Sequence, residues 1–327
     1  MRNDRIAKAV AHLPSQLSVV MGVGPGACSK RHKQMKMENE FSPRSSLDEV
    51  WTCLEVDVGA VSHQGHVREN NEDSYLVMRF GRSLENVITN VEEDLLEQNY
   101  FMNGYGLLVA DGMGGMAGGE VASRLALSKL IELIIETSDW TLALQRHQDV
   151  TTVLERMTER FLQLDTILRK EADNDHTLQG MGTTLTVAGA LGSDLIIGHV
   201  GDSRAYLLHG DTLTQLTTDH TLAQALIDAG VANRDDPASR SMRRVLTAAV
   251  GSLGEQFDPQ VQNFKLSAGD KLLLCTDGLT EMVEDATIAQ VLREAKSAQI
   301  ACQDLVDLSL AGGGTDNVTV VLAHFVC

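Results

Sequence analysis

The sequence predicts an α+β layered domain, in which helices cover the faces of a β-core. Short apolar runs separated by turn residues recur from about Cys53 onward, which is typical of antiparallel strands. Two stretches with helical periodicity interrupt these runs, one in mid-chain and one before the last run, so each is placed to cover one face of the core. The expected strands are 54–61, 74–78, 105–110, 183–191, 195–200, 205–208, 271–275 and 318–325.

The helical stretches come in pairs. Apolar residues from Leu127 to Ile134 repeat at i, i+3, i+4 and i+7, and a second stripe from Val153 to Leu168 continues one face over about four turns. These two segments predict a long helical hairpin. Near the C-terminus, stripes over 288–295 and 302–309 predict a second helical pair.

Three segments differ from this pattern. Residues 1–50 lack periodicity and are rich in Gly, Ser, Lys and Met, which predicts a disordered N-terminal extension to a domain at 51–327. Residues 82–104 indicate an acidic, helix-containing insertion between two strands. Residues 219–250 hold a short helix that ends at Gly230, followed by an irregular stretch with several arginines. These are Arg234, Arg240, Arg243 and Arg244.

The charge of the chain argues against nucleic acid as its main partner. The 327 residues include 27 Lys and Arg against 45 Asp and Glu, and the net charge of −18 repels a phosphate backbone. Residues 1–50 carry eight basic and five acidic residues, so the acidic excess lies wholly in the predicted domain. Such an excess indicates a solvated surface or bound cations. No apolar run approaches the ~18 to 20 residues of a membrane-spanning helix.

The five cysteines are an odd number with no close C-x-x-C pair. This favours reduced thiols over disulfides or a zinc site, and therefore a cytoplasmic protein. Pro14, Ser15 and Gln16 interrupt the apolar N-terminal stretch, which argues against a secretory signal. We expect Cys53 and Cys275 to be core residues, because neither has the basic neighbours that produce a reactive thiolate.

Aspartates stand at the ends of four predicted strands. Asp111 and Asp277 each follow an apolar run and precede a glycine, whereas Asp316 and Asp73 stand just before a strand. If the last strand runs antiparallel to the strands that end at Asp111 and Asp277, three carboxylates converge on one edge of the core, and Asp73 supplies a fourth. A single Asp-Gly is more often a turn. Four such positions at strand ends indicate a functional site.

Converging carboxylates predict metal ions. Without cations they would repel one another and raise each other's pKa. Oxygen ligands without His or Cys suit Mg²⁺ or Mn²⁺, which usually work on phosphate substrates, and the Gly112 carbonyl has no side chain to obstruct it. Asp202, in a Gly-Asp-Ser turn, is explained equally well as a hairpin residue. The glycine-rich segment 110–119 does not indicate a nucleotide-binding loop. No Gly-Lys-Ser/Thr follows it, as in a P-loop, and it has neither the G-x-G-x-x-G spacing nor the ribose-binding acid of a dinucleotide-binding motif.

Eight motifs, in order along residues 53–327, carry a resemblance to a known family. They are SHQGHVRENNEDS (62–74), LLVADGMGG (107–115), GMGTTLT (180–186), GHVGDSRAYLL (198–208), LTTDHTLAQALIDAG (216–230), VLTAAVGS (245–252), LLLCTDGLTE (272–281) and GGTDNVTVVL (313–322). In these motifs the chain resembles the metal-dependent protein Ser/Thr phosphatases of the PPM (type 2C) family, and in detail its bacterial branch. The resemblance implies an α-β-β-α sandwich of two antiparallel sheets flanked by helical pairs, with a dinuclear metal site at one end.

The resemblance also implies roles for individual residues. Asp111 matches the ligand that bridges two metals, with the Gly112 carbonyl on one of them, and Asp277 and Asp316 match ligands of the other. Arg68 matches the arginine that grips the substrate phosphate, a task that suits a guanidinium fork. Asp73 and Glu72 match residues that hold metal-bound waters, and Asn317 matches a residue beside the ligands. Asp202 matches a ligand of a third, weaker metal, and residues 219–250 match a flap that borders the site.

The implied activity is hydrolysis of phosphoserine and phosphothreonine on proteins, with two Mg²⁺ or Mn²⁺ ions and direct attack by a metal-bound hydroxide. No protein nucleophile is then required. Many eukaryotic members have His where this chain has Met113, so the leaving group is expected to take its proton from a metal-bound water. We expect His63, His66 and His220 to be solvated or hydrogen-bonded rather than general acids.

Two alternatives stay open. A catalytically inactive homologue would act as a binding module, although the ligand positions and Arg68 are all present. An enzyme of the same fold in a partner-switching pathway would have one small phosphoprotein as its substrate. The expected partners are phosphorylated proteins that a Ser/Thr kinase produces, with no nucleic acid and no membrane insertion. The acidic surplus favours substrates with basic residues beside the phosphorylated one.

Overall fold

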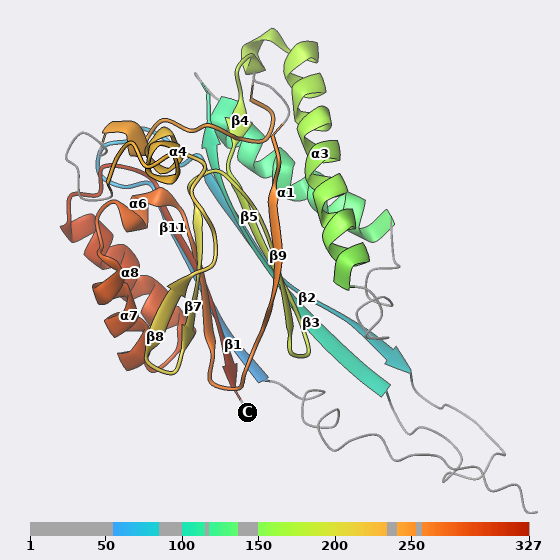
Figure 1. The fold of residues 1–327 in the computed structure, drawn as a ribbon, viewed down its shortest axis with the longest axis vertical. Helices are drawn as coiled ribbons and strands as arrows, with labels where there is room; N and C mark the ends of the chain where they lie inside the picture. The colour runs from blue at the N-terminus through green and yellow to red at the C-terminus, as the bar shows by residue number, and fades with distance from the viewer. Residues whose placement is uncertain are drawn as a thin grey trace, which may run out of the picture. The chain divides into compact units, whose positions relative to one another are not determined.

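Two antiparallel sheets lie face to face, and a pair of helices covers the outer side of each (Figure 1). The structure, a computed structural model of the chain, describes residues 55–84, 100–114, 118–136, 150–233, 241–252 and 257–326. The two sheets with a helical pair on each outer side confirm the predicted α-β-β-α sandwich of two antiparallel sheets flanked by helical pairs.

The elements follow the layers. In spatial order, the first sheet contains β1 (Glu55–His63), β11 (Val318–Val326), β10 (Lys271–Cys275), β7 (Arg204–His209) and β8 (Thr212–Gln215). The second contains β2 (Asp73–Leu84), β3 (Tyr100–Met113), β5 (Leu185–Leu191), β6 (Asp194–Val200) and β9 (Gln260–Lys265), with β4 (Gly182–Thr183) paired to β3. Helices α7 (Asp285–Glu294) and α8 (Ala298–Ala311) cover the first sheet, and α1 (Gly118–Glu136) and α3 (Val150–Asn174) cover the second. Shorter helical segments are a 3₁₀ turn (His176–Leu178), α4 (Leu222–Asp228) and α6 (Asp277–Thr280).

Three apolar layers hold the sandwich together. Leu107 and Leu272 belong to the layer between the sheets, Phe161 of α3 packs in the layer over the second sheet, and Leu305 of α8 packs in the layer over the first. Each of these side chains is fully buried, which contributes about 1.5–3 kcal/mol per side chain. Strands that are covered on both faces are buried at consecutive positions rather than at alternate ones, and β6 and β11 show this pattern.

Most of the predicted elements are present. Both predicted helical pairs are confirmed, as α1 with α3 and α7 with α8. The expected strand 183–191 is two strands, because Thr184 separates β4 from β5. Two strands were not predicted, β8 and β9, and both are edge strands whose side chains are mostly polar and in part exposed.

The boundaries of the acidic insertion need correction. Residues 82–84 and 100–104 are not part of it, because β2 runs to Leu84 and pairs with β3 from Tyr100. The backbone ladder continues beyond the apolar residues that marked these strands in the sequence. Residues 85–99 lie outside the described residues, as do the predicted extension 1–50 and the arginines at 234 and 240.

Two further observations concern the environment of the chain. Within the described ranges, no helix is long and apolar enough to cross a membrane. Cys275 and Cys302 are buried free thiols, and burial raises the pKa of each to about 12. Cys275 is therefore a core residue, as predicted, whereas Cys53 lies outside the described residues.

Candidate functional site

The strand topology brings the predicted carboxylates to one end of the sandwich. Asp73 and Asp111 face each other as register partners of β2 and β3. Asp277 follows β10 after one residue, Thr276, and is the first residue of α6. Asp316 precedes β11, which is antiparallel to β10. A cavity of about 300 Å³ opens here. The predicted site residues that line it are Arg68, Glu72, Asp111, Gly112, Asp202, Asp277, Asp316 and Asn317.

Asp111 lies inside β3 rather than after it, and Thr184 fixes its backbone. The Asp111 N–H donates to Thr184 Oγ1 at 2.9 Å, and the Thr184 N–H donates to the Asp111 carbonyl at 2.9 Å. Thr184 Oγ1 also lies 2.8 Å from Ser203 Oγ, in the turn that carries Asp202. No pattern in the sequence marks Thr184 or Ser203 as site residues. They connect the strand of Asp111 to the turn of Asp202.

Gly112 lies where the backbone of β3 passes the start of α1. A Cβ at this position would lie 2.0 Å from the Gly119 carbonyl oxygen and 2.8 Å from that of Glu72. The Gly112 N–H donates to the same Glu72 carbonyl at 3.2 Å. Only glycine permits this approach, and the backbone of Gly112 lines the cavity without a side chain in front of it.

Two of the carboxylates have a buried oxygen without a partner. Asp73 is 8% exposed and lies behind the cavity lining, where Thr276 Oγ1 donates to its Oδ2 at 2.9 Å. Asp73 Oδ1 and Asp277 Oδ1 are both buried with no hydrogen-bond partner among the described residues. A buried polar atom left in this state costs about 1–3 kcal/mol, and more when it is charged. Both oxygens are suited to receive a cation.

The electrostatics of the site agree with the geometry. Burial, opposed by hydrogen bonds from Thr319 and Thr276, raises the pKa of Asp73 to about 7. Burial and then the charges of Asp316 and Glu281 raise the pKa of Asp277 to about 7.

The pKa values of Asp111 and Asp202 are raised for the same reasons. Burial, followed by the charges of Asp73 and Asp277, raises the pKa of Asp111 well above its usual range. Burial and then the charge of Asp277 do the same for Asp202, which is 9% exposed in the turn between β6 and β7. The site thus concentrates more negative charge than its own residues neutralise.

The donor set fits hard divalent cations. Every candidate ligand at the cavity is an oxygen, which suits Mg²⁺ and Mn²⁺. In the described part of the chain, no three His, Cys, Asp or Glu side chains already converge as a metal-binding group. Ions such as Mg²⁺ use one or two carboxylates and keep several waters, so the set fits ions bound with much of their hydration shell.

Arg68 reaches the carboxylates from the loop after β1. Its Nη2 donates to Asp316 Oδ2 at 2.6 Å, and this hydrogen bond raises the pKa of Arg68. The Arg68 side chain is nevertheless 52% exposed, so its guanidinium can turn toward a ligand in the cavity.

Asn317 holds the loop that carries Arg68. Its Nδ2 donates to the carbonyls of Gln64 and Asn70, both at 2.8 Å. Its Oδ1 accepts from the Glu72 N–H at 2.8 Å. One buried side chain therefore sets the position of the Arg68 loop relative to β2 and β11.

The histidines of the motifs lie outside the cavity lining. His63 Nδ1 accepts from the Gly65 N–H at 2.9 Å, and the rings of His63 and His66 meet edge to face with centroids 6.3 Å apart. His220 Nδ1 accepts from the Gly201 N–H at 3.2 Å. Met113, by contrast, lines the cavity.

Comparisons with known proteins agree with this site. The chain matches the family described as protein phosphatase 2C over residues 91–308. The chain belongs to the protein phosphatase 2C family. It is 35% identical over 267 residues to the serine/threonine protein phosphatase PstP of Mycobacterium tuberculosis, covering 82% of this chain and 44% of PstP. It is also 36% identical over 219 residues to the serine/threonine phosphatase stp of Listeria innocua, covering 67% of this chain and 83% of that protein.

Solved structures of this family share the fold. The crystal structure of Mycobacterium tuberculosis PstP/Ppp superposes with a TM-score of 0.65 at 32% identity, covering 84% of this chain and all of that one. The catalytic domain of PstP in complex with two manganese ions gives a TM-score of 0.63, with the same identity and coverage. The chain spans less than half the length of full PstP.

Proposed function

We propose that this chain is a Mg²⁺- or Mn²⁺-dependent protein phosphatase that hydrolyses phosphoserine and phosphothreonine. The observation that carries the proposal is the group of carboxylates that lines one cavity, together with the buried oxygens of Asp277 and of nearby Asp73 that have no partner among the described residues. Membership of the protein phosphatase 2C family and the two manganese ions in the PstP catalytic domain support it.

The carboxylates are assigned to two divalent cations. We propose that Asp111 and the Gly112 carbonyl would hold one of them, and that Asp111, Asp277 and Asp316 would hold the other. Asp73 and Glu72 would hydrogen-bond to waters of these ions, and Asp202 would be a ligand of a third, weaker ion. The bound cations would supply a water of lowered pKa and offset the negative charge of the phosphoryl group.

Arg68 is assigned to the substrate phosphate. Its guanidinium fork matches two phosphoryl oxygens, and its half-exposed position leaves it free to exchange Asp316 for the substrate. Asn317 acts through Arg68 by holding its loop. In the reaction the oxygen of a water attacks phosphorus, and the bond from phosphorus to the seryl or threonyl oxygen breaks.

The leaving oxygen then needs a proton. Met113 stands on the cavity wall and has none to give, and the described lining contains no histidine, lysine or cysteine. We therefore infer that solvent water in the cavity supplies the proton. The pH dependence of turnover would then lack the descending limb of a histidine acid.

The partners follow from this chemistry. The substrates are phosphoproteins that a Ser/Thr kinase produces, and the net charge of −18 argues against nucleic acid. Buried free thiols at Cys275 and Cys302 support a place in the reducing cytoplasm, where the enzyme would reverse kinase signalling. A partner-switching phosphatase with a single small substrate would differ only in its substrate range.

The deciding assay uses a phosphoserine or phosphothreonine peptide and the purified chain. We expect turnover with Mn²⁺ that a chelator abolishes and that exceeds the turnover of Asp277→Ala. Equal turnover by the wild type and Asp277→Ala would reject the enzyme and favour an inactive binding module. A protein restricted to 51–327 should keep this activity if residues 1–50 are an extension.

A further inference from the structure

Two guanidinium groups line the carboxylate cavity, and the proposed mechanism uses only Arg68. The second belongs to Arg244, in the segment of the predicted flap that returns from α4 to the core. Backbone bonds fix this segment: the Leu222 N–H donates to the Val245 carbonyl at 2.8 Å, and the Thr247 N–H donates to the His220 carbonyl at 2.9 Å. The backbone of the residues that follow Arg244 thus holds its segment at the cavity.

The Arg244 side chain grips a carboxylate of the chain itself. Its Nε donates to Glu281 Oε1 at 2.9 Å and its Nη2 to Glu281 Oε2 at 2.5 Å, the paired geometry in which arginine binds carboxylate or phosphate. Glu281 lies four residues after Asp277, at the end of α6. The Arg244 side chain is 64% exposed and the Glu281 side chain 21%, so the pair stands at the surface of the cavity. Ion pairs of solvent-exposed arginines contribute little to stability, and an incoming anion can therefore displace Glu281 from the guanidinium.

We propose that Arg244 is a specificity residue that binds a second anionic group of the substrate, beside the phosphoserine or phosphothreonine that is hydrolysed. Glu281 occupies the guanidinium fork until that group arrives. The inference rests on the proposed phosphatase function and names the class of substrate: peptides with a carboxylate or a second phosphate next to the reacting residue.

Local charge outweighs the net charge of the domain at this position. The acidic surplus of the chain favours basic substrates, but exposed charges more than about 8 Å apart are largely screened at physiological salt. A group in direct contact with Arg244 therefore responds to the guanidinium first. The cavity, at about 300 Å³, holds the volume of about ten waters, which leaves room for more than a phosphoryl group.

The test compares phosphoserine peptides that differ at one neighbouring position, which is neutral, glutamate or phosphoserine, placed in turn on either side. The readout is the ratio of kcat/KM for each anionic peptide to that for the neutral one. We expect Arg244→Gln to lower this ratio about tenfold, the effect of one charge-assisted contact. Glu281→Gln should raise it about threefold by releasing the guanidinium. The glutamate and phosphoserine arms show which anion the enzyme prefers.

Two controls separate this role from others. In the Arg244→Gln background, Glu281→Gln should give no gain, because the two side chains act on each other. Glu284→Gln, an exposed acid three residues further along, should leave the ratio unchanged. A lower ratio in Glu281→Gln would show that the pair only holds Arg244 in place. A gain from Glu281→Gln that persists in the Arg244→Gln background would show only long-range repulsion between Glu281 and the anionic peptide. Either result overturns the inference while the neutral peptide is still hydrolysed, whereas a wild type that hydrolyses no peptide overturns the proposed function itself.

Discussion

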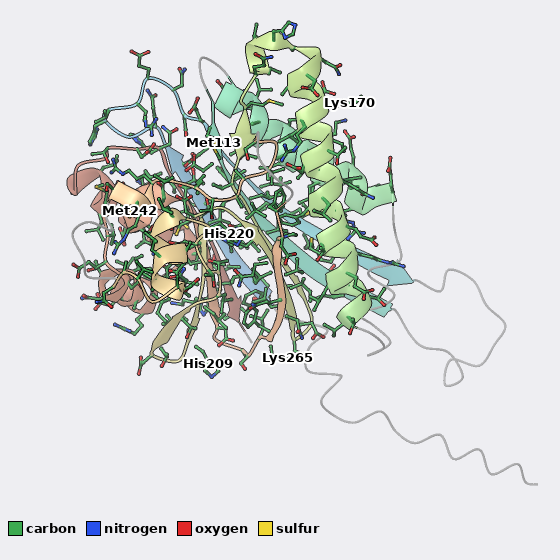
Figure 2. All side chains as sticks on the ribbon, turned by 45° about the horizontal axis from the view of Figure 1, so that its top comes forward. Met113, Lys170, His209, His220, Met242 and Lys265 are labelled. Atoms are coloured by element: carbon green, nitrogen blue, oxygen red, sulfur yellow. The ribbon has the colours of Figure 1, made fainter. Side chains whose placement is uncertain are left out.

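Strand β10 has a carboxylate beside each of its ends, and the two have different surroundings. Before the strand, Asp270 is 1% exposed, and its oxygens lie 2.7 Å from His209 Nδ1 and 2.8 Å from the Ser267 N–H. After the strand, Asp277 has a buried oxygen with no partner among the described residues, and burial raises its pKa to about 7. Figure 2 shows His209 and Met113 near opposite ends of the sandwich.

The difference in hydrogen-bond partners distinguishes Asp270, a structural carboxylate, from Asp277, a functional one. The groups around Asp270 satisfy both of its oxygens, so the residue closes a turn and needs nothing further. The groups around Asp277 and Asp73 leave an oxygen of each unsatisfied, which destabilises the metal-free fold. A cost of this kind at a cavity is typical of a site whose missing partner is a ligand.

Replacement of Asp277 or Asp270 by asparagine should have opposite effects on turnover and on stability. We expect Asp277→Asn to lower kcat on a phosphopeptide by about 10³-fold, the scale of losing one group that stabilises the transition state, because the carboxylate that holds a cation is gone. Its metal-free Tm should not fall, because a charge without a partner has been removed. Asp270→Asn should keep kcat within about twofold and lose about 1–3 kcal/mol of unfolding free energy.

Steady-state kinetics with Mn²⁺ and thermal unfolding without it check both variants. The comparison is wrong if Asp270→Asn folds normally and loses turnover, or if Asp277→Asn keeps its turnover. Circular dichroism of each variant at the assay temperature shows whether the measured protein is folded.

Two glycines of the second sheet also differ between the carboxylate end and the rest of the sheet. Gly112, at the carboxylate end, leaves a Cβ only 2.0 Å from a backbone oxygen of α1, whereas nothing lies within 4 Å of a Cβ on Gly189 in β5. We expect Gly112→Ala to cost about 3 kcal/mol, because the start of α1 must move. Gly189→Ala should change stability by less than about 0.5 kcal/mol. Urea unfolding of both variants measures the difference, and equal losses would mean that the close approach is not required.

The sequence predicted the elements whose side chains are buried. The stripes of α7 and α8 and the apolar runs of β10 and β11 follow from burial on fixed faces, and these elements place Asp277 and Asp316. Edge strands β8 and β9 were missed because their polar, partly exposed side chains give no apolar run. The ends of β2 and β3 were missed because Arg79 and Gly81 in one strand and Asn103 and Gly104 in the other interrupt the apolar run before the paired segment ends.

The site divides in the same way. Aspartates at strand ends are visible in a sequence, because the strand and the following turn both leave a pattern. The residues that position them do not: Thr276 bonds to Asp73 across 203 positions, and Thr184 bonds to Asp111 across 73. Nothing in the sequence distinguishes Glu281 from other acidic residues, and only the fold shows that it pairs with Arg244. Contacts of this kind depend on the tertiary structure and have no local signature.

Manganese should stabilise the protein, and the effect should depend on pH. At 100 times its Kd a bound ion adds about 2.7 kcal/mol of unfolding free energy, or about 5–10 °C in Tm for a domain of this size. Asp73 and Asp277, with pKa values of about 7, take up protons that an unfolded carboxylate binds only near 3.9. Between these values the folded metal-free protein binds more protons than the unfolded chain, so its stability falls as the pH rises through this window.

Below pH 7 an ion must displace those protons, so the Tm gain from Mn²⁺ at pH 7.5 should fall by at least half at pH 5.5. Comparing samples with and without Mn²⁺ at each pH cancels groups that the ion does not touch, such as buried His199, whose lowered pKa of about 3 gives the opposite slope. Asp270→Asn should keep the pH-dependent gain and Asp277→Asn should lose most of it. An equal gain at both pH values would mean that the carboxylates with raised pKa are not the ligands, and the contrast between the two ends of β10 would then have no bearing on metal.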